Sequence, residues 1–575
     1  MSKKVLERFF QGKKSVYFWA LILAGSITWS TVMVKSGLVY GYGMGFWGPN
    51  GHDGVWHIAL AKSLARGSWG MPIFAGEALT NYHVGFDLLL AALHKITTIP
   101  VSTLYFQIIP PILALVIGLL TYKLVLLWRK SRPQALWALF FVYFGGSFGW
   151  MVTLLREGRI GGESMFWSQQ AVSTLINPPF ALSILLMLVG LILLQKSIKT
   201  RSVSTALLTI LTFGVLVQVK VYAGILSLGG LFLAGLWQMF KRKETGLMKI
   251  FAGALVISIA LFLPLNKGAQ DTIVFKPFWF LETMMGLTDR VGWTRFGEAM
   301  VNYKLGNVWL KAIPAYLIAF LIFWYGNMGT RLISKFFVLK RIKDKKISLI
   351  EIFIFSVILA GVVIPMFFLQ AGTPWNTIQF FYYSLFFSGI LAGIFMGEFF
   401  EKKARGLAIF GPLVIILFTV PTTISTLIYH YLPARPPAKV SRGELEALKF
   451  LSTQPNGVVL TYPFDRAAAQ AAVANPPRPL YLYESTAYVS AFADKPVYLE
   501  DEVNLDITGY DWRGRREEIE DWLVTNDHAR AYNFLRENNL TYIYWLRGQR
   551  ATLGESQLGI TKVFENSEVD IYKVD

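Results

Sequence analysis

The chain has 575 residues, of which 54% are hydrophobic and 16% charged, and its mean hydropathy is +0.46. This composition is too apolar for an ordinary soluble protein. Its 55 Lys and Arg outnumber its 36 Asp and Glu, which gives a formal net charge of +19. It has no cysteine, which excludes disulfides, thiolate metal sites and cysteine nucleophiles.

Apolar stretches of about 20 residues, long enough to cross a hydrocarbon core as a helix, recur along the chain. They lack the alternation of barrel strands. We therefore expect a polytopic α-helical membrane protein with about 11 transmembrane helices. The expected spans are 16–36, 104–128, 134–155, 178–195, 203–219, 221–240, 248–265, 309–326, 349–370, 379–399 and 406–428.

Short basic segments set the expected orientation, because Lys and Arg are retained on the cytoplasmic side. When the spans are threaded in order, these segments all fall on one side. We therefore expect a cytoplasmic N-terminus on an uncleaved signal anchor, an extracytoplasmic C-terminus and a location in the cell membrane. Topology explains the basic charge better than nucleic-acid binding does. The segments are 1–14, 129–132, 196–201, 241–243, 331–346 and 401–405.

The loop 37–103, between the first two spans, is expected outside and carries four of the six histidines. Asp53 and His57 are four residues apart in a segment without proline, so a helix there would place both on one face. His83 and Asp87 repeat this spacing in reverse order. The sequence predicts two short amphipathic helices, near 53–66 and 82–95, lying at the membrane interface.

Three interpretations of Asp53 remain open from the residues alone. It could act as a general base that takes a proton from an acceptor hydroxyl, with histidine tuning its pKa. It could bind a divalent metal together with His57, His83 and Asp87. It could also simply cap the helix that follows it.

Further along the chain, Lys220 interrupts two apolar runs at the expected outer surface. A lysine there opposes the positive-inside rule and is costly near lipid unless it is paired or functional. Snorkelling to the headgroups is the plainer alternative. The loops 156–177 and 266–308 are also expected outside, and they carry Arg159 and Arg295, whose forked donors suit phosphate.

The composition turns polar after the proline-rich linker at 432–437, and residues 433–575 are expected to form an extracytoplasmic α/β domain. Residues 1–432 form the transmembrane domain in this interpretation. Ser441 is a plausible N-cap, and helices and strands alternate after it. The expected elements are helices near 441–451, 514–524 and 527–538, strands near 458–462 and 541–546, and a hairpin of 562–565 with 569–574.

The first loop resembles that of the C-type glycosyltransferase (GT-C) superfamily, in the branch of the protein O-mannosyltransferases and the lipid A aminoarabinose transferase. The resemblance covers about 45 residues and rests on the order of Asp53, the segment 67–72 and Gly76-Glu77. The sequence departs from the family at Gly54, where a second acidic residue is usual, and at 81–83, where Asn-Tyr-His replaces Lys-Pro-Pro.

The resemblance implies that a hexosyl or pentosyl group moves from a polyprenyl-phosphate donor to an acceptor on the outer face. It implies that Asp53 is the base. The departing phosphate needs a cation, and Lys220, Arg159 and Arg295 are the candidates in that order. Residues expected to line the substrate site are Tyr82, His57, His83 and Asp87.

No cofactor is expected, with a divalent metal on Asp53, His57, His83 and Asp87 as the alternative. The expected partners are the lipid-linked donor, membrane lipids and an acceptor of unknown class. Two other classes of function remain open. A lipid or polysaccharide transporter would use the same bundle but should show internal repeats. A non-catalytic membrane scaffold, whose C-terminal domain binds a partner, would not need Asp53.

Overall fold

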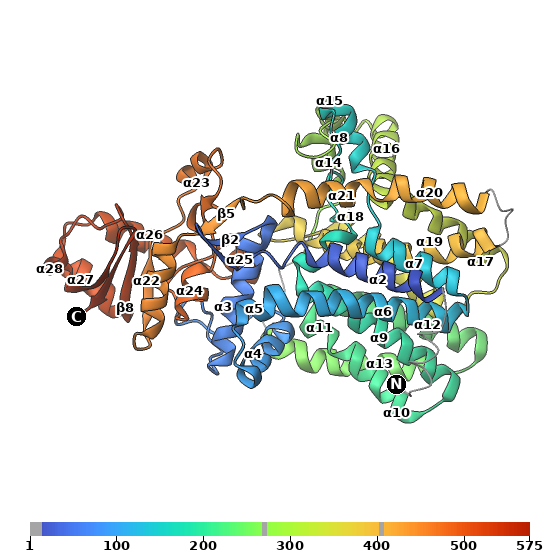
Figure 1. Cartoon of the computed structure of the whole chain (residues 1–575), viewed down its shortest axis with the longest axis horizontal. Coiled ribbons are helices and arrows are strands. Elements are labelled where there is room, and N and C mark those ends of the chain that lie inside the picture. The colour runs from blue at the N-terminus through green and yellow to red at the C-terminus, as the bar shows by residue number, and fades with distance from the viewer. Residues whose placement is uncertain (1–13, 267–272, 402–406) are drawn as a thin grey trace. The chain divides into compact units, whose positions relative to one another are not determined.

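The computed structural model describes residues 14–266, 273–401 and 407–575 (Figure 1). The chain divides into two compact units, and each is described by itself. The first unit contains the described residues of Met1–Val32, Pro110–Pro264 and Ile273–Leu432. The second contains those of Met33–Ile109, Leu265–Thr272 and Pro433–Asp575. The first loop thus belongs to the same unit as the C-terminal region.

The first unit is a bundle of long apolar helices. Among the described residues, eight helices are long and apolar enough to cross a membrane, and the bent pair α7 and α8 makes up to nine. The two remaining predicted spans correspond to shorter apolar helices, Val16–Ser30 and Val203–Val219. The helical membrane fold is therefore confirmed. Its main helices are α2 (Lys14–Ser30), α6 (Ile109–Arg129), α7 (Arg132–Phe144), α8 (Gly149–Glu157), α9 (Pro178–Thr200), α10 (Val203–Gly214), α11 (Leu216–Val219), α12 (Val221–Arg242), α13 (Gly246–Phe262), α14 (Trp279–Gly286), α15 (Thr294–Leu305), α16 (Trp309–Met328), α17 (Ser334–Lys343), α18 (Leu349–Phe367), α19 (Gln379–Glu401), α20 (Leu407–Thr419) and α21 (Pro421–Thr426).

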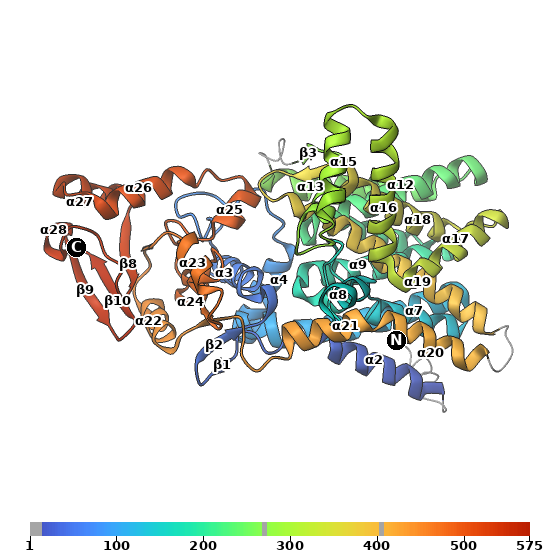
Figure 2. The ribbon, with the colours of Figure 1, turned by 90° about the horizontal axis from the view of Figure 1, so that it is seen from above.

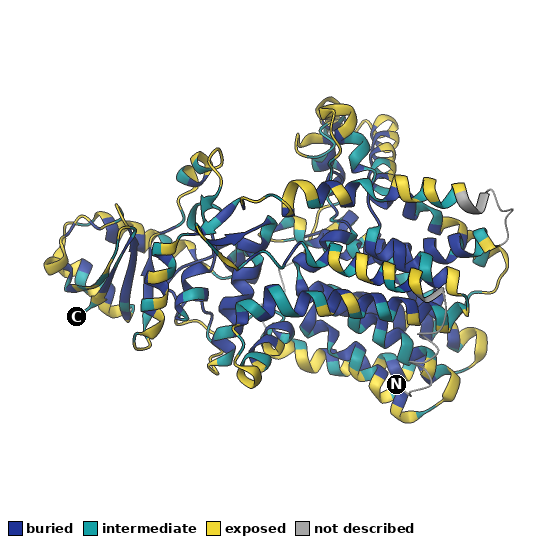
Figure 3. Cartoon of the chain, in the orientation of Figure 1, coloured by how far each residue is buried: buried dark blue, intermediate teal, exposed yellow. Residues whose placement is uncertain are grey.

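Burial separates a central helix from helices with apolar outer faces (Figure 3). The most apolar window of Pro374–Glu401, which contains α19, is 89% buried, whereas that of Gly246–Leu265 is 22% buried. Exposed apolar side chains such as Leu310 and Phe410 suit contact with lipid tails. Figures 1 and 2 show α16 standing across the direction of α2 and α20, so the predicted span at 309–326 differs in direction from theirs.

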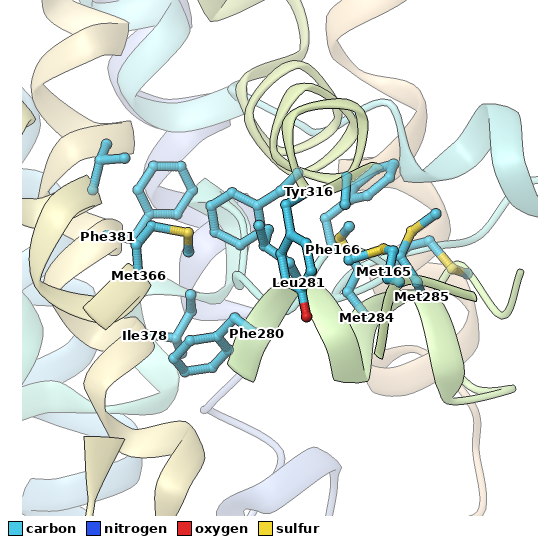
Figure 4. Close-up of a cluster of buried hydrophobic side chains, with 14 of the residues drawn as sticks. Met165, Phe166, Phe280, Leu281, Met284, Met285, Tyr316, Met366, Ile378 and Phe381 are labelled. Carbon is cyan, nitrogen blue, oxygen red and sulfur yellow. The ribbon is translucent and has the colours of Figure 1, made fainter. Parts of the chain in front are cut away.

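A methionine-rich cluster packs where α14, α16, α18 and α19 meet (Figure 4). Met284 and Met285 of α14 and Phe381 of α19 are fully buried. Methionine fills irregular gaps because its side chain is unbranched and flexible. This cluster fixes α14, the first helix of the loop between α13 and α16, against the bundle.

Arg331 was predicted to lie in a basic cytoplasmic run, but its side chain is buried. It donates hydrogen bonds to Gln170 Oε1 at 2.5 Å and to the carbonyls of Asn327 and Met328 at 2.7 and 3.1 Å. The guanidinium therefore satisfies carbonyls at the end of α16, which a helix leaves unpaired. Of the predicted basic segments 1–14 and 401–405, residues 1–13 and 402–405 lie outside the described residues.

The second unit contains a sheet that joins the first loop to the C-terminal region. Its order is β1-β2-β5-β7. Its strands are β1 (Val39–Tyr40), β2 (Gly43–Phe46), β5 (Ala438–Val440) and β7 (Arg478–Pro479). At Gly43, φ is +117° and a Cβ would meet Val440 O at 2.1 Å, so only glycine permits β2 to pair with β5.

The predicted C-terminal elements are all present. Ser441 caps α22 (Arg442–Thr453) in a capping box with Glu444. The second sheet has the order β6-β8-β10-β9, in which β6 runs parallel to β8 and the other pairs are antiparallel. Its strands and neighbouring helices are β6 (Val458–Thr461), β8 (Leu540–Leu546), β9 (Ile560–Glu565), β10 (Val569–Val574), α23 (Arg466–Ala472), α24 (Tyr488–Ala493), α25 (Glu502–Thr508), α26 (Arg513–Val524), α27 (His528–Glu537) and α28 (Glu555–Leu558).

Both helices expected in the first loop form, as α3 (Asp53–Ala65) and α4 (Gly85–Thr97). The prediction that α3 is an amphipathic helix lying at the membrane interface is wrong. Nearly all of its residues are buried, because it packs against α4 and α24 within the second unit. The apolar residues between Asp53 and Arg66 therefore serve a protein core rather than a lipid face.

Candidate functional site

Asp53 is the first residue of α3, and its side chain is 38% exposed. Its Oδ1 lies 3.1 Å from Nδ1 of His52, the residue at the N-cap position. His52 Nε2 lies 3.2 Å from Oδ1 of Asp501, whose side chain is fully buried. One imidazole therefore links a carboxylate at the surface of the unit to a carboxylate inside it.

The surroundings of His52 determine the charge of the linked side chains Asp53, His52 and Asp501. Burial alone would lower the pKa of the imidazole, but the charge of Asp501 and the hydrogen bonds to Asp501 and Asp53 hold that pKa well above its usual value. The ring is thus a cation at neutral pH and donates both N–H groups to the carboxylates. The position of Asp53 at a helix N-terminus also favours negative charge there.

Asp501 is held in place by its own hydrogen bonds. It caps α25 by accepting from Asn504 N at 3.1 Å, and its Oδ2 accepts from Asn504 Nδ2 at 2.7 Å. Glu484 lies close enough for its charge to act on His52 and for Asp53 and Asp501 to act on it. Burial first, and then these carboxylates, raise the pKa of Glu484.

His57 and Asp87 form a second pair. His57 Nδ1 lies 2.7 Å from Asp87 Oδ1, and both side chains are buried. The His57 ring stacks on Tyr105 at 5.5 Å between centroids and meets Phe86 edge-on. The sequence paired Asp53 with His57 and His83 with Asp87 within single helices. In the structure, the contact between His57 and Asp87 instead joins α3 to α4.

Tyr82 and His83 lie just before α4 and stack on each other at 4.6 Å. Tyr82 also meets Trp56 of α3 edge-on at 5.3 Å. Burial, followed by the charge of Asp87, raises the pKa of Tyr82 well above its usual value, so the phenol stays protonated. These aromatic rings pack against the side of α3 that carries His57.

Gly54, the position of the missing second acidic residue, has a steric explanation. A Cβ at Gly54 would lie 2.5 Å from Phe106 Cζ and 3.1 Å from Tyr105 Cε1. No side chain fits there without moving those buried rings. Among the described residues, no group of three or more His, Asp and Glu side chains is arranged to hold a metal ion.

Lys220, the first-ranked cation, belongs to the other unit and is only 5% exposed. It occupies the N-cap position of α12, and its Nζ donates to Asn177 Oδ1 at 3.4 Å. Asn177 in turn caps α9 by accepting from Phe180 N. Lys220 therefore places a positive charge beside two helix N-termini, where anions bind readily.

Arg159 and Arg295 also belong to the first unit. Arg159 has an exposed side chain that pairs with Glu157 at 2.8 Å, and Arg295 is exposed on α15. Two nearby arginines, Arg156 and Arg290, make more contacts with the protein. Arg156 donates to the carbonyls of Thr288, Arg290 and Val291, and Arg290 lies 4.3 Å over the Trp167 ring. Arg156 thus secures the loop that carries Arg290.

The partners of Asp53 were not predicted from the sequence. His52 was counted among the loop histidines without a role, and Asp501 and Glu484 lie more than 400 residues along the chain. No local spacing links these positions to Asp53. Only in the structure does the pairing of β2 with β5 bring these C-terminal residues to the first loop.

No model of a protein family matches the chain, and no curated protein matches it by sequence. Its structure is similar to that of the Archaeoglobus fulgidus oligosaccharyltransferase. The form tethered to an acceptor peptide is 12% identical, with a TM-score of 0.51 over 94% of this chain and 70% of that one. The apo form is 12% identical with a TM-score of 0.52, over 92% of this chain and 69% of that one. The form with an inhibitory peptide and a dolichol-phosphate is 10% identical with a TM-score of 0.50, over 93% and 70%.

Proposed function

We propose that this chain, which has the fold of the C-type glycosyltransferases (GT-C), is a membrane glycosyltransferase that uses a lipid-linked sugar donor. The solved neighbour forms a complex with a dolichol-phosphate, which supports a polyprenyl-phosphate carrier here as well. The apolar helices of the first unit suit a substrate with a long hydrocarbon chain. The reaction is expected on the extracytoplasmic face.

The observation that carries the proposal is the carboxylate of Asp53, which is partly exposed and is held by His52. A base that removes a proton from an acceptor must be accessible and fixed in direction. The imidazolium of His52 fixes Asp53, and the buried Asp501 holds the imidazolium. Asp53 is the catalytic residue in this proposal, and His52 and Asp501 position it.

In the proposed step, the acceptor hydroxyl gives its proton to Asp53 while its oxygen forms a bond to the anomeric carbon. The bond between that carbon and the phosphate oxygen breaks, and the polyprenyl phosphate leaves with the electron pair. Attack opposite the leaving group inverts the anomeric carbon. Negative charge grows on the phosphate, so a fixed cation lowers the barrier. Lys220 is our first candidate because it is buried beside two helix N-termini.

The proposal is tested with membranes that contain the chain and a radiolabelled polyprenyl-phosphate sugar. Wild type should move label from the lipid to a water-soluble or protein fraction, and Asp53→Asn should not. Asp511→Asn, which changes an exposed aspartate of the same unit, is the matched control and should transfer as wild type does. Equal transfer by Asp53→Asn and wild type would show that Asp53 is not the base.

The scaffold and transporter alternatives make a different forecast for the same membranes. Neither requires the bond between sugar and phosphate to break, so label would remain on the lipid in every variant. No separate observation on the described residues favours either alternative.

A further inference from the structure

A cavity of about 370 Å³ lies within the C-terminal part of the second unit. It opens between the end of β6, the segment 481–488, the segment 499–502 and the residues that follow β8. Small-molecule sites have volumes of about 300–1,000 Å³. The cavity therefore has room for a small ligand or the end of a longer one.

The wall of the cavity offers polar groups that the protein does not use. Thr486 is 4% exposed, and its Oγ1 has no hydrogen-bond partner among the described residues. The Glu484 carboxylate likewise forms no hydrogen bond or ion pair with the described part of the chain. Tyr462 and Tyr481 add aromatic rings. A buried hydroxyl without a partner costs free energy unless a ligand or water completes it.

The acidic side chains of the wall make the cavity unsuitable for an anionic ligand. Five carboxylates line it, and Arg550 is its one basic side chain within the described residues. Burial raises the pKa of Glu500 to about 8, and it also raises the pKa of Glu484 and of Glu502, which pairs with Arg516. Acidic side chains still outnumber basic ones on the wall. A lipid phosphate or a sugar phosphate would be repelled here. The cavity is thus unsuited to the donor of the proposed reaction.

The strand β6 beside the cavity has no open edge to which an extended peptide could add. Peptides commonly bind by adding a strand to an open sheet edge. The outer edge of β6 is already covered, because Val459 N donates to Pro496 O and Tyr498 N donates to Val459 O. Aromatic rings, hydroxyls and carboxylates instead match the faces and hydroxyl groups of a neutral saccharide.

Asp501 belongs both to the cavity wall and to the hydrogen-bonded side chains that lead to Asp53. Asp501 lines the cavity and bonds His52, which bonds Asp53. Glu484 lines the cavity and lies close enough for the charges of His52 and Asp53 to act on it. Asp501 and His52 thus connect the wall of the cavity to the proposed base.

We infer that this cavity binds the acceptor and that the acceptor is an uncharged saccharide. The inference rests on the proposed function, since it names the acceptor of that reaction. Tyr481 stacks on a sugar ring. The Glu484 carboxylate accepts hydrogen bonds from its hydroxyls, and the Thr486 hydroxyl donates to them or accepts from them. In this inference the acceptor extends from the cavity toward Asp53, which takes the proton of its reacting hydroxyl.

Binding is measured on the full chain in lipid nanodiscs, so that no glycoside detergent competes. Saturation-transfer NMR uses methyl glycosides of mannose, galactose, glucose and arabinose, a neutral hexapeptide, and inorganic phosphate. We expect at least one glycoside to bind and neither the peptide nor phosphate to bind. Glu484→Gln and Tyr481→Ala should each weaken that binding about tenfold or more.

Two controls separate binding from folding. Glu446→Gln changes an exposed glutamate of α22 outside the cavity and should bind within twofold of wild type. Tyr481→Phe loses only the hydroxyl and keeps the ring that stacks on the sugar, so it should bind within about twofold of wild type. Peptide or phosphate binding without glycoside binding would overturn the inference. So would glycoside binding that the cavity variants leave unchanged.

The two proposals can fail separately. Asp53→Asn should bind the glycoside as wild type does and yet transfer no sugar. Glycoside binding without any transfer by wild type would refute the enzyme and leave the saccharide site standing. Transfer whose acceptor KM is the same in wild type, Glu484→Gln and Tyr481→Ala would refute the site and leave the enzyme standing.

Discussion

Two residues that are adjacent in sequence have different tasks at the proposed site. Asp53 is partly exposed, whereas His52 is buried between Asp53 and Asp501. Because a histidine between two carboxylates is stable as a cation, the pair of acids does not need a metal to coexist. Metal independence nevertheless remains a prediction, to be checked by activity in the presence of a chelator.

The raised pKa of His52 predicts how stability depends on pH. The imidazolium is favoured in the folded chain, so its contribution is complete below the unfolded pKa of about 6.5 and is lost as pH rises through the higher folded pKa. His52→Gln should therefore be destabilised most near pH 6, by about 3–5 kcal/mol. The difference from wild type should shrink in alkali, as measured by thermal unfolding.

The exposed His528, at the start of α27, provides the control for this measurement. His528→Gln should unfold within about 0.5 kcal/mol of wild type across the same range. A gap between His52→Gln and wild type that stays constant from pH 6 to 10 would contradict the charged state assigned to His52.

Lys220 allows a prediction about the use of the lipid donor. If Lys220 stabilises the departing phosphate, Lys220→Gln should lower kcat/KM for the lipid donor about tenfold or more, because a hydrogen bond to a charged group is worth about 1.5–3 kcal/mol. Lys343→Gln, at the exposed end of α17, should leave this ratio unchanged. Equal ratios for Lys220→Gln and Lys343→Gln would remove Lys220 from the mechanism.

At the scale of elements, α3 is a core helix whose first turn carries the site. Its close fit to Phe106 predicts that Gly54→Ala is destabilised by about 1–3 kcal/mol, since added methyl groups overpack a filled core. Gly514→Ala is the matched control, because a Cβ there meets nothing within 4 Å. Alanine at this position in α26 should stabilise slightly. Chemical denaturation of both variants decides the matter.

Local patterns predicted the elements well but not their partners. The capping box at Ser441, the strand runs and the apolar spans all depend on neighbouring residues, and the structure contains each of them. The pairing of β2 with β5 and the contact of His52 with Asp501 join residues that are about 400 or more positions apart. The sequence carries no periodicity for such contacts, which explains why α3 was assigned to a membrane surface.

At the scale of the whole molecule, the first loop and the C-terminal region form one compact unit. We therefore expect them on the same side of the membrane. A tag fused after Asp575 and a cysteine introduced at the exposed Trp69 should both be labelled from outside intact cells by a reagent that cannot cross the membrane. Labelling of one without the other would contradict a shared unit, and labelling of neither would reverse the predicted orientation.

The most direct measurement is a single-turnover reaction of the purified chain with a synthetic polyprenyl-phosphate sugar, followed alongside donor binding. A general base contributes about 10²–10⁴-fold to rate. We expect Asp53→Asn to bind the donor with the wild-type Kd and to release polyprenyl phosphate at least about 10²-fold more slowly. Release at the wild-type rate by Asp53→Asn would show that Asp53 is not the general base.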